Sequence, residues 1–382
     1  MNIGLVVPGF SADATDWCIP ALRHLARTLA ARDDVRVLAL RYPYSAGRYA
    51  IDGAEVLSLG GGLAHGAATL ELWRTILQAL RFEHARRRFD VLHAFWATES
   101  GLLAALAGRI LGVPTLVSLA GGELVAARDI GYGDQRTAWE RLKVAASLRL
   151  ASGVSAGSRL LQALAERRLR GSKRVHLAPL GVDVALFSPA RTMAPVGVDV
   201  ALSSPARADT PSRIVHVGTL TPVKDHATLL HAFSLARQDV PEARLEIVGS
   251  GPLAADLRRL SGRLGLDGSV CFRGEVDHAE LPSVYRGASA CVVSSRHEAQ
   301  CMVALEAAAC GVPLAGTRVG VLPELTSALA AIGDAPALAA AMTALVRNRS
   351  EPDQVTAHVR ANYALEACAD GFRALYRALG AV

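Results

Sequence analysis

Short apolar runs alternate with longer segments of helical periodicity along most of the chain. In the N-terminal half the apolar runs have strand length and cover residues 3–7, 35–40, 91–94 and 115–119. Strands that alternate with helices pair into a parallel sheet covered by helices on both faces. The pattern therefore predicts a doubly wound α/β domain in this half.

The C-terminal half repeats the order of strand, loop and helix. Residues 213–233 begin with a strand ending at Gly218 and close with a helix that carries Leu229, Leu230 and Phe233 on its apolar face. Further segments of the same series follow at residues 244–253, 270–276, 288–310 and 316–325. The loops of such a sheet gather at one edge, where ligands bind.

The most informative stretch is residues 294–313, which carries Glu298 and Glu306 with seven residues between them. An apolar run of strand length precedes it, and residues 302–310 form an alanine-rich helix. Glu298 would lie where this helix begins, beside backbone N–H groups of residues 299–302 that can hold a phosphate. Glu306, two turns further on, can accept hydrogen bonds from ribose hydroxyls. Two such glutamates are more often solvated surface charges, but these follow directly on a strand of the predicted sheet.

Lys224 lies in the loop that follows the strand ending at Gly218. The chain has 41 lysines and arginines, of which only Lys143, Lys173 and Lys224 are lysines. An ammonium is a compact point charge that suits a diphosphate. A random surface lysine is the alternative, and the position in this loop favours a role in phosphate binding.

Together these segments resemble the family 4 glycosyltransferases, which are retaining enzymes of the two-domain GT-B fold. The resemblance covers nearly the whole chain and depends on the order and spacing of its motifs, VGTLTPVKD, LEIVGSGPL, EAQCMVALE, EAAACGVP and TRVGVLPE. It implies two Rossmann-like domains facing each other across a cleft. It also implies transfer of a sugar from a nucleotide-diphospho-sugar, which is a substrate, so no cofactor is expected.

The resemblance also implies the roles of individual residues. Glu298 contacts the hydroxyls of the donor sugar and Lys224 holds the diphosphate, and both are the expected catalytic residues. Donor contacts are implied for Gly9, Gly218, Thr219, Arg273, Val276, Ala299, Gln300, Cys301, Met302 and Glu306. Residues expected to line the cleft or the acceptor site are Trp17, Trp96, Gly121, Gly122 and Glu123.

The chain departs from the family pattern at several positions. Thr219 stands where an arginine is often found, so Lys224 and the helix N-terminus must carry more of the phosphate charge. Gln300 and Cys301 add bulk where the family has a Gly-x-Gly segment and the donor sugar passes. Ala120 stands where many members have a histidine beside the donor sugar.

Two other functions remain open. One is a GT-B epimerase that acts on the sugar nucleotide itself, and the other is a catalytically silent sugar-nucleotide-binding protein. No D-x-D motif occurs in the chain, which favours diphosphate stabilisation without a metal. The loop after the first strand lacks G-x-G-x-x-G, which argues against a dinucleotide dehydrogenase.

The resemblance divides the chain into four parts. We expect an acceptor-side domain over residues 1–178, a linker over 179–210, a nucleotide-sugar-binding domain over 211–360 and, over 361–382, a helix that crosses back to the first domain. Within the linker, GVDVALFSPAR recurs sixteen residues later as GVDVALSSPAR, which indicates a tandem duplication. We expect the second copy to be a solvent-exposed insertion, because lengthening a loop costs little free energy.

The net charge of +6 resides in the N-terminal half. Residues 1–186 hold 23 basic and 16 acidic residues, a balance of +7, and clusters of basic residues lie at 81–89 and 166–174. Such a face suits an anionic membrane surface and a lipid-linked acceptor, although a solvated helix face is equally compatible. No motif that reads nucleic acid accompanies the charge.

The six cysteines show no C-x2-C pairing and fall mostly in apolar stretches, which predicts buried, reduced thiols of a cytoplasmic protein. No basic segment precedes the first apolar run, so no secretory signal is expected. The longest apolar region, residues 101–122, is interrupted by Arg109 and Pro114, so no spanning helix is expected. A cytoplasmic protein, peripheral at the inner face of the membrane, fits these features.

Overall fold

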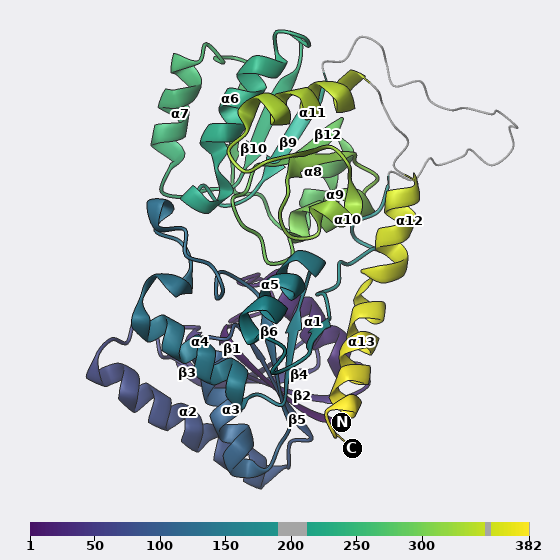
Figure 1. Ribbon diagram of the computed structural model, residues 1–382. Coiled ribbons are helices and arrows are strands. Elements are labelled where there is room, and N and C mark those ends of the chain that lie inside the picture. Colours follow the sequence, from purple (N-terminus) through teal and green to yellow (C-terminus); the bar gives the residue numbers. More distant parts are fainter. Residues whose placement is uncertain (190–211, 348–352, 382) are drawn as a thin grey trace, which may run out of the picture.

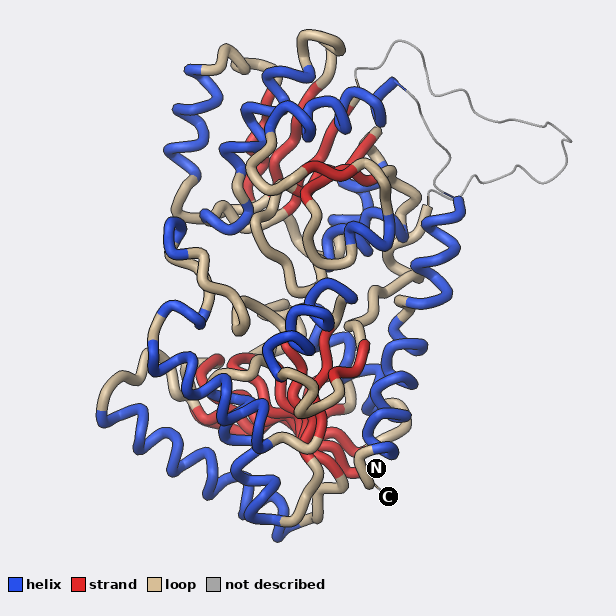
Figure 2. The backbone as a smooth tube through the Cα atoms, in the orientation of Figure 1, coloured by secondary structure: helices blue, strands red, loops and turns tan. Residues whose placement is uncertain are grey.

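The computed structural model describes residues 1–189, 212–347 and 353–381. Figure 1 shows two α/β domains, with the N-terminal domain below and the C-terminal domain above, and Figure 2 shows the strands of each at the centre of its helices. Two doubly wound α/β domains were predicted from the sequence, and the structure confirms them. The carboxyl ends of the strands of the two sheets face each other across the space between the domains.

The N-terminal sheet has eight strands in the order β3-β4-β2-β1-β5-β6-β7-β8, and all neighbours pair in parallel except β3 and β4. Apolar side chains point to both faces of its central strands, so both faces are covered by helices. The strands are β1 (Asn2–Gly9), β2 (Asp34–Tyr42), β3 (Ala46–Ile51), β4 (Ala54–Leu59), β5 (Val91–Phe95), β6 (Thr115–Leu119), β7 (Gly153–Ala156) and β8 (Val175–Leu177).

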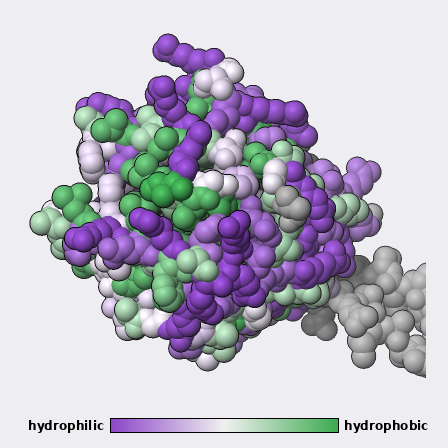
Figure 3. Space-filling model, turned by 90° about the horizontal axis from the view of Figure 1, so that it is seen from below, coloured by the Kyte–Doolittle hydropathy of each residue, from purple (hydrophilic) through white to green (hydrophobic). Residues whose placement is uncertain are grey.

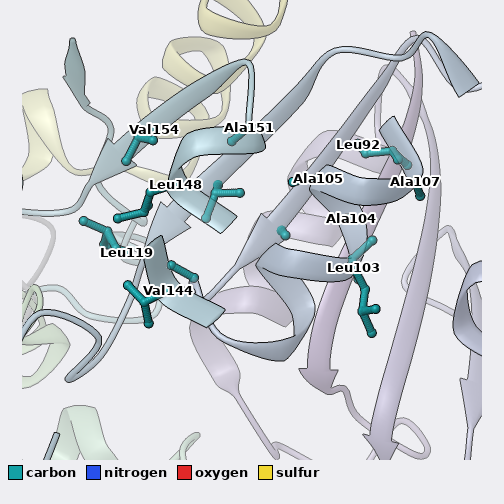
Figure 4. Close-up of a cluster of buried hydrophobic side chains, with 14 of the residues drawn as sticks. Leu92, Leu103, Ala104, Ala105, Ala107, Leu119, Val144, Leu148, Ala151 and Val154 are labelled. Carbon is teal, nitrogen blue, oxygen red and sulfur yellow. The ribbon is translucent and has the colours of Figure 1, made fainter. Parts of the chain in front are cut away.

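Helices α2 to α5 cover one face of this sheet, and α1 covers the other face. The apolar cluster under α2 to α5 is continuous, and Figure 4 shows the part of it that involves α3, α4 and neighbouring strands. The helices are α1 (Pro20–Ala30), α2 (Ala67–Arg86), α3 (Glu99–Leu111), α4 (Ala138–Leu150) and α5 (Arg159–Leu169). At the lower end of this domain, hydrophobic side chains gather among hydrophilic ones on the surface (Figure 3).

The C-terminal sheet has six parallel strands in the order β11-β10-β9-β12-β13-β14. These strands are β9 (Arg213–Val217), β10 (Arg244–Val248), β11 (Val270–Gly274), β12 (Ala290–Val293), β13 (Leu314–Thr317) and β14 (Leu329–Ala330). One face packs on α6 (His226–Ala236), α7 (Ala254–Arg263) and α11 (Ala335–Arg347). The other packs on α8 (Leu281–Arg286), α9 (Met302–Ala309), α10 (Leu322–Leu325) and α12 (Asp353–Asn362).

The chain crosses between the domains twice, and the two crossings touch. The linker residue Val182 donates its N–H to the carbonyl of Tyr363, which lies between α12 and α13 (Leu365–Ala378). Helix α13 then packs on the N-terminal sheet beside α1, where Phe372 and Tyr376 are fully buried. Phe187 of the linker is buried against the C-terminal domain. The second copy of the duplicated segment lies outside the described residues.

The expectation of buried cysteines is wrong for two of the six. Cys18 lies in the irregular loop after β1 and Cys271 on the edge strand β11, and both are exposed, whereas the other four are buried. All six are free thiols. Among the described residues, no helix is both long enough and apolar enough to cross a membrane.

Phe372 tests whether α13 belongs to the N-terminal core. Its ring lies 5.0 Å from the ring of His93 and 6.3 Å from that of Phe95, between centroids. We expect Phe372→Ala to lower the free energy of unfolding by about 3–5 kcal/mol, because it opens a large cavity. Denaturant melts provide the measurement. Arg377→Ala, on the exposed face of the same helix, is the control and should change stability by less than about 0.5 kcal/mol. Equal effects of the two variants would contradict this account.

Candidate active site

The carboxyl ends of the strands of both sheets meet at the domain boundary. A cavity of about 290 Å³ lies between them. Its wall includes Trp96 and Ala120 from the N-terminal domain and Lys224, Glu298 and Met302 from the C-terminal domain. Because ligands of doubly wound sheets bind at this edge, this cavity is the candidate active site.

Lys224 and Glu298, the two expected catalytic residues, form an ion pair on the cavity wall. Lys224 Nζ donates to Glu298 Oε1 over 2.5 Å, and the hydroxyl of Ser295 donates to the same oxygen over 2.6 Å. Burial acts to lower the pKa of Lys224, but the negative charge of Glu298 raises it above its ordinary value. Among the described residues, Glu298 is the one hydrogen-bond acceptor of Lys224 Nζ. The other two N–H groups of this ammonium can therefore reach a ligand.

The helix that follows Glu298 begins at Met302, as the sequence predicted. Cys301 precedes it in the left-handed conformation, with φ of 80°. The N–H of Ala304 bonds to the carbonyl of Cys301, whereas the N–H groups of Met302 and Val303 point out of the first turn without an intrahelical acceptor. The N–H groups of Met302 and Val303 at the start of α9 can therefore hold a phosphate, and Met302 belongs to the expected range 299–302.

Glu306 lies further along α9 and faces a second cavity, also of about 290 Å³. Its Oε2 accepts a hydrogen bond from the hydroxyl of Tyr285 over 2.8 Å, and its Oε1 lies 3.7 Å from Nε2 of His278. Trp17, expected at the acceptor site, stacks on His278, which lines this cavity, with ring centroids 5.0 Å apart. The first turn of α9 lines both cavities, so one extended ligand can occupy the two.

Gln300, expected to narrow the path of the donor sugar, uses its side chain to hold the linker. Its Oε1 accepts from the N–H of Leu180 over 2.8 Å, and its Nε2 donates to the carbonyl of Leu180 over 2.7 Å. The side chain also packs so closely on Gly157 that a Cβ there would collide with Oε1. Beside it, the hydroxyl of Ser158 donates to the carbonyl of Ala299 over 2.7 Å. Gln300 therefore joins the C-terminal domain to the linker and to β7.

Glu123, expected in the cleft, is fully buried and organises the loop that lines it. Its carboxylate accepts backbone N–H groups from Ala97, Ala120 and Gly121 at 3.3, 2.9 and 2.7 Å. Burial raises the pKa of Glu123, while these hydrogen bonds act in the opposite direction. The carboxylate fixes the backbone that carries Ala120 to the cavity wall.

The same loop also contacts the C-terminal domain. A Cβ on Gly121 would lie 2.7 Å from Nε1 of Trp96, and one on Gly122 would lie 2.9 Å from the ring of Tyr132, so glycines allow the loop to pack closely. The carbonyl of Gly121 accepts a hydrogen bond from Nε2 of His297 over 3.0 Å. These contacts close one side of the interdomain cavity.

Five of the expected donor residues line neither cavity. Gly218 is next to the site, since a Cβ there would lie 3.6 Å from the side chain of Lys224. Arg273 of β11 pairs with Glu246 of β10 over 2.9 Å. The others are Thr219, which is exposed, Val276, which packs on the C-terminal core, and Gly9, which packs on Tyr42 and Cys18.

His216 of β9 lines the cavity and was not predicted. Its Nδ1 donates to the carbonyl of Val292 over 2.8 Å, and burial lowers its pKa to about 4. The ring is therefore neutral near pH 7, and Nε2 carries a lone pair. This nitrogen is buried without a partner in the described part of the chain, so it can accept a hydrogen bond from a ligand hydroxyl. The one signal in the sequence is a polar residue inside the apolar run IVHV.

Comparison with known families divides the chain as the fold does. Residues 19–181 match the glycosyl transferase 4-like domain, and residues 211–348 match the glycosyl transferases group 1. The D-inositol 3-phosphate glycosyltransferase of Segniliparus rotundus is 30% identical over 77% of this chain and 67% of its own length. That of Salinispora arenicola is 31% identical over 68% of this chain. The matched region covers 61% of the length of this Salinispora arenicola protein.

Solved structures extend the likeness to nearly the whole chain. Sucrose-phosphate synthase from Thermosynechococcus elongatus superposes with a TM-score of 0.74 at 25% identity, covering 99% of this chain and 98% of the other. HepE of Anabaena, in complex with UDP and glucose, has a TM-score of 0.70 at 17% identity and 99% coverage of both chains. These likenesses confirm the GT-B fold. The motifs, the two domain matches and the relatives agree, and the chain belongs to the group 1 glycosyl transferases of the glycosyl transferase 4-like type.

Proposed function

We propose that the protein transfers a sugar from a nucleotide-diphospho-sugar to an acceptor hydroxyl, with retention of configuration and without a metal. The observation that carries the proposal is the Lys224–Glu298 pair, which lies on the wall of the interdomain cavity beside the start of α9. The activity in the names of the relatives supports it, as do the UDP and glucose bound by HepE.

The donor would extend through both cavities. Its ribose would lie against Glu306, since the Oε1 of this carboxylate is not taken by Tyr285. The diphosphate would lie at the N–H groups of Met302 and Val303, where the helix dipole favours negative charge. The sugar would then reach Glu298, whose second oxygen can accept hydrogen bonds from sugar hydroxyls.

The chemistry follows from where charge develops. As the bond between the anomeric carbon and the diphosphate oxygen breaks, negative charge grows on the diphosphate, and Lys224 and the start of α9 stabilise it. In a retaining reaction the departing oxygen takes the proton of the acceptor hydroxyl on the same face of the sugar, while the new glycosidic bond forms. Lys224 can serve the phosphate without releasing Glu298, because an ammonium has three N–H groups.

For the acceptor we propose a sugar or a lipid-linked molecule used in the synthesis of a glycan, glycolipid or cell-surface polysaccharide. The basic excess of the N-terminal half supports a cytoplasmic protein that works at an anionic membrane surface. Epimerisation of the sugar nucleotide and silent binding are the competing functions. Product analysis with and without acceptor separates the first from transfer, and donor binding without turnover identifies the second.

Substitutions at the three charged residues test the proposal. We expect Lys224→Ala and Glu298→Gln each to lower kcat by about 10²–10³-fold, because each removes a group that acts on the charge of the transition state. Glu306→Gln keeps an acceptor for Tyr285 and should raise the KM for the donor with little change in kcat. Steady-state kinetics, with a donor found by a thermal-shift screen of sugar nucleotides, provides the measurement.

The matched control is Arg237→Ala. Arg237 is half-buried at the end of α6, where its side chain contacts the carbonyl of Pro241, and it lines neither cavity, so its removal should leave both constants unchanged. Thermal melts of every variant separate loss of activity from loss of fold. A wild-type kcat in Glu298→Gln would contradict the proposed mechanism.

Ala120 provides an independent test of the enzyme against the silent binding protein. It lines the cavity beside Trp96, where many family members have a histidine. Because the departing diphosphate can take the acceptor proton, a side chain here would orient the sugar and would not be essential. We expect the wild type to give product with retained anomeric configuration, and Ala120→His to change the rate or donor preference. NMR of the anomeric proton of the product, recorded for both proteins, measures the configuration and the rate. An inactive wild type that Ala120→His activates would show that this chain has lost its activity.

A further inference from the structure

A groove of about 650 Å³ lies between α4 and α5 of the N-terminal domain, and none of its residues lines the two cavities described above. Its floor is apolar and is formed by Leu124, Val144, Ala145, Leu148 and Leu169. Its rim carries four cations, Arg141, Arg149, Arg168 and Lys173. Within the described ranges, no acidic side chain lines it. The groove therefore combines uncompensated positive charge with an apolar surface.

The cations are held in different ways. Lys173 is anchored, because its Nζ donates to the carbonyl of Leu148 over 2.9 Å and to that of Ala151 at the end of α4. Burial lowers the pKa of Lys173, and the charge of Arg109 acts in the same direction. Arg149 and Arg168 are exposed, and neither makes an ion pair with any residue that the structure describes. Both guanidinium groups can therefore turn to a ligand.

The other basic cluster of this domain, residues 81–89, is partly paired with acids. Arg86 lies 3.2 Å from the carboxylates of both Glu55 and Glu83, and Arg87 pairs with Asp34. The same two glutamates also pair with Arg36 and Arg48, so this region keeps an excess of basic side chains. The groove differs from this cluster because its cations surround an apolar floor.

We propose that the groove binds an anionic amphiphile, a molecule with a phosphate group and an apolar chain. The rim supplies charge-assisted hydrogen bonds to the phosphate, and the floor removes the chain from water. The occupant would lie behind the loop that carries Ala120, since Gln135 of the groove donates through Nε2 to the carbonyl of Glu123 over 2.5 Å. This binding is independent of sugar transfer, so its test does not require an active enzyme.

Calorimetry with decyl phosphate, kept below its micelle concentration, tests the proposal on the full-length protein. Inorganic phosphate and decyl maltoside isolate the charge and the chain, and we expect each to bind at least about tenfold more weakly, a difference of about 1.4 kcal/mol. Arg149→Ala combined with Arg168→Ala should weaken decyl phosphate binding at least about tenfold. Ala145→Glu, which places a carboxylate on the exposed floor, should do the same.

Arg167→Ala is the matched control, because Arg167 is exposed on α5 next to Arg168 but does not line the groove. The affinity of this variant for decyl phosphate should equal that of the wild type. Sedimentation with phosphatidylglycerol and phosphatidylcholine vesicles identifies the source of the amphiphile. Retention by the anionic vesicles alone, lost in the double variant, supports a membrane lipid, whereas decyl phosphate binding without retention supports a soluble amphiphile.

Three results would overturn the proposal. The first is equal affinity for inorganic phosphate and decyl phosphate, which would make the groove a simple anion site. The second is unchanged decyl phosphate binding in the double variant and in Ala145→Glu. The third is displacement of decyl phosphate by a single-stranded oligonucleotide that binds more tightly, which would assign the charge to nucleic acid.

Discussion

The turn between β12 and α9 must contact three parts of the molecule at once. Glu298 pairs with Lys224 on the neighbouring strand's loop, His297 reaches Gly121 of the N-terminal domain, and Gln300 binds both backbone groups of Leu180 in the linker. Because these partners come from both domains and from the linker, the turn cannot shift without changing the interface. The same eight-residue segment, residues 294–301, thus fixes both the geometry of the interdomain cavity and the arrangement of the domains.

This constraint explains why the turn tolerates an unfavourable backbone at Cys301. A left-handed conformation costs an L-residue roughly 1–2 kcal/mol, and glycine would avoid the cost. Here the conformation directs Met302 and Val303 into the helix with their N–H groups toward the cavities, while the carbonyl of Gln300 accepts the N–H of Val321 over 2.8 Å. Gly320 packs on the same corner, where a Cβ would lie 3.1 Å from that of Cys301. The strain is therefore offset by contacts on both sides of the turn.

The sequence predicted the strands with continuous apolar runs and missed those without them. Strand β3 is largely exposed and has no apolar run, so the hairpin of β3 and β4 was not predicted. Its turn, Asp52–Gly53, has positive φ at both residues and is a strong local hairpin signal that could have revealed it. Periodicity detects burial, and an exposed edge strand offers little of it.

The sequence identified two charged residues that line the cavity, but not the residues that they contact. The spacing of motifs identified Lys224 and Glu298, and the family pattern assigned them to donor binding. Their direct pairing depends on how two loops 74 residues apart approach each other. The structural roles of Gln300 and Glu123 depend on partners from distant segments, which no local pattern specifies. The role of His216 could not be predicted from the sequence either. Its Nε2 can bind a ligand because β9 ends at the cavity, which only the fold shows.

The distribution of charge shows the same difference between sequence and space. Basic clusters at residues 81–89 and 166–174 look alike along the chain. In the fold the first lies beside strands that carry Glu55 and Asp34, whereas the second meets the end of α4, where Lys173 already caps the last carbonyls. Helix C-termini attract cations, and Lys173 is the cation at this one. Arg149 and Arg168 beside it make no ion pair with any residue that the structure describes. The cations of the groove therefore gather where a helix ends, beside an apolar floor that would favour an amphiphile over a simple anion.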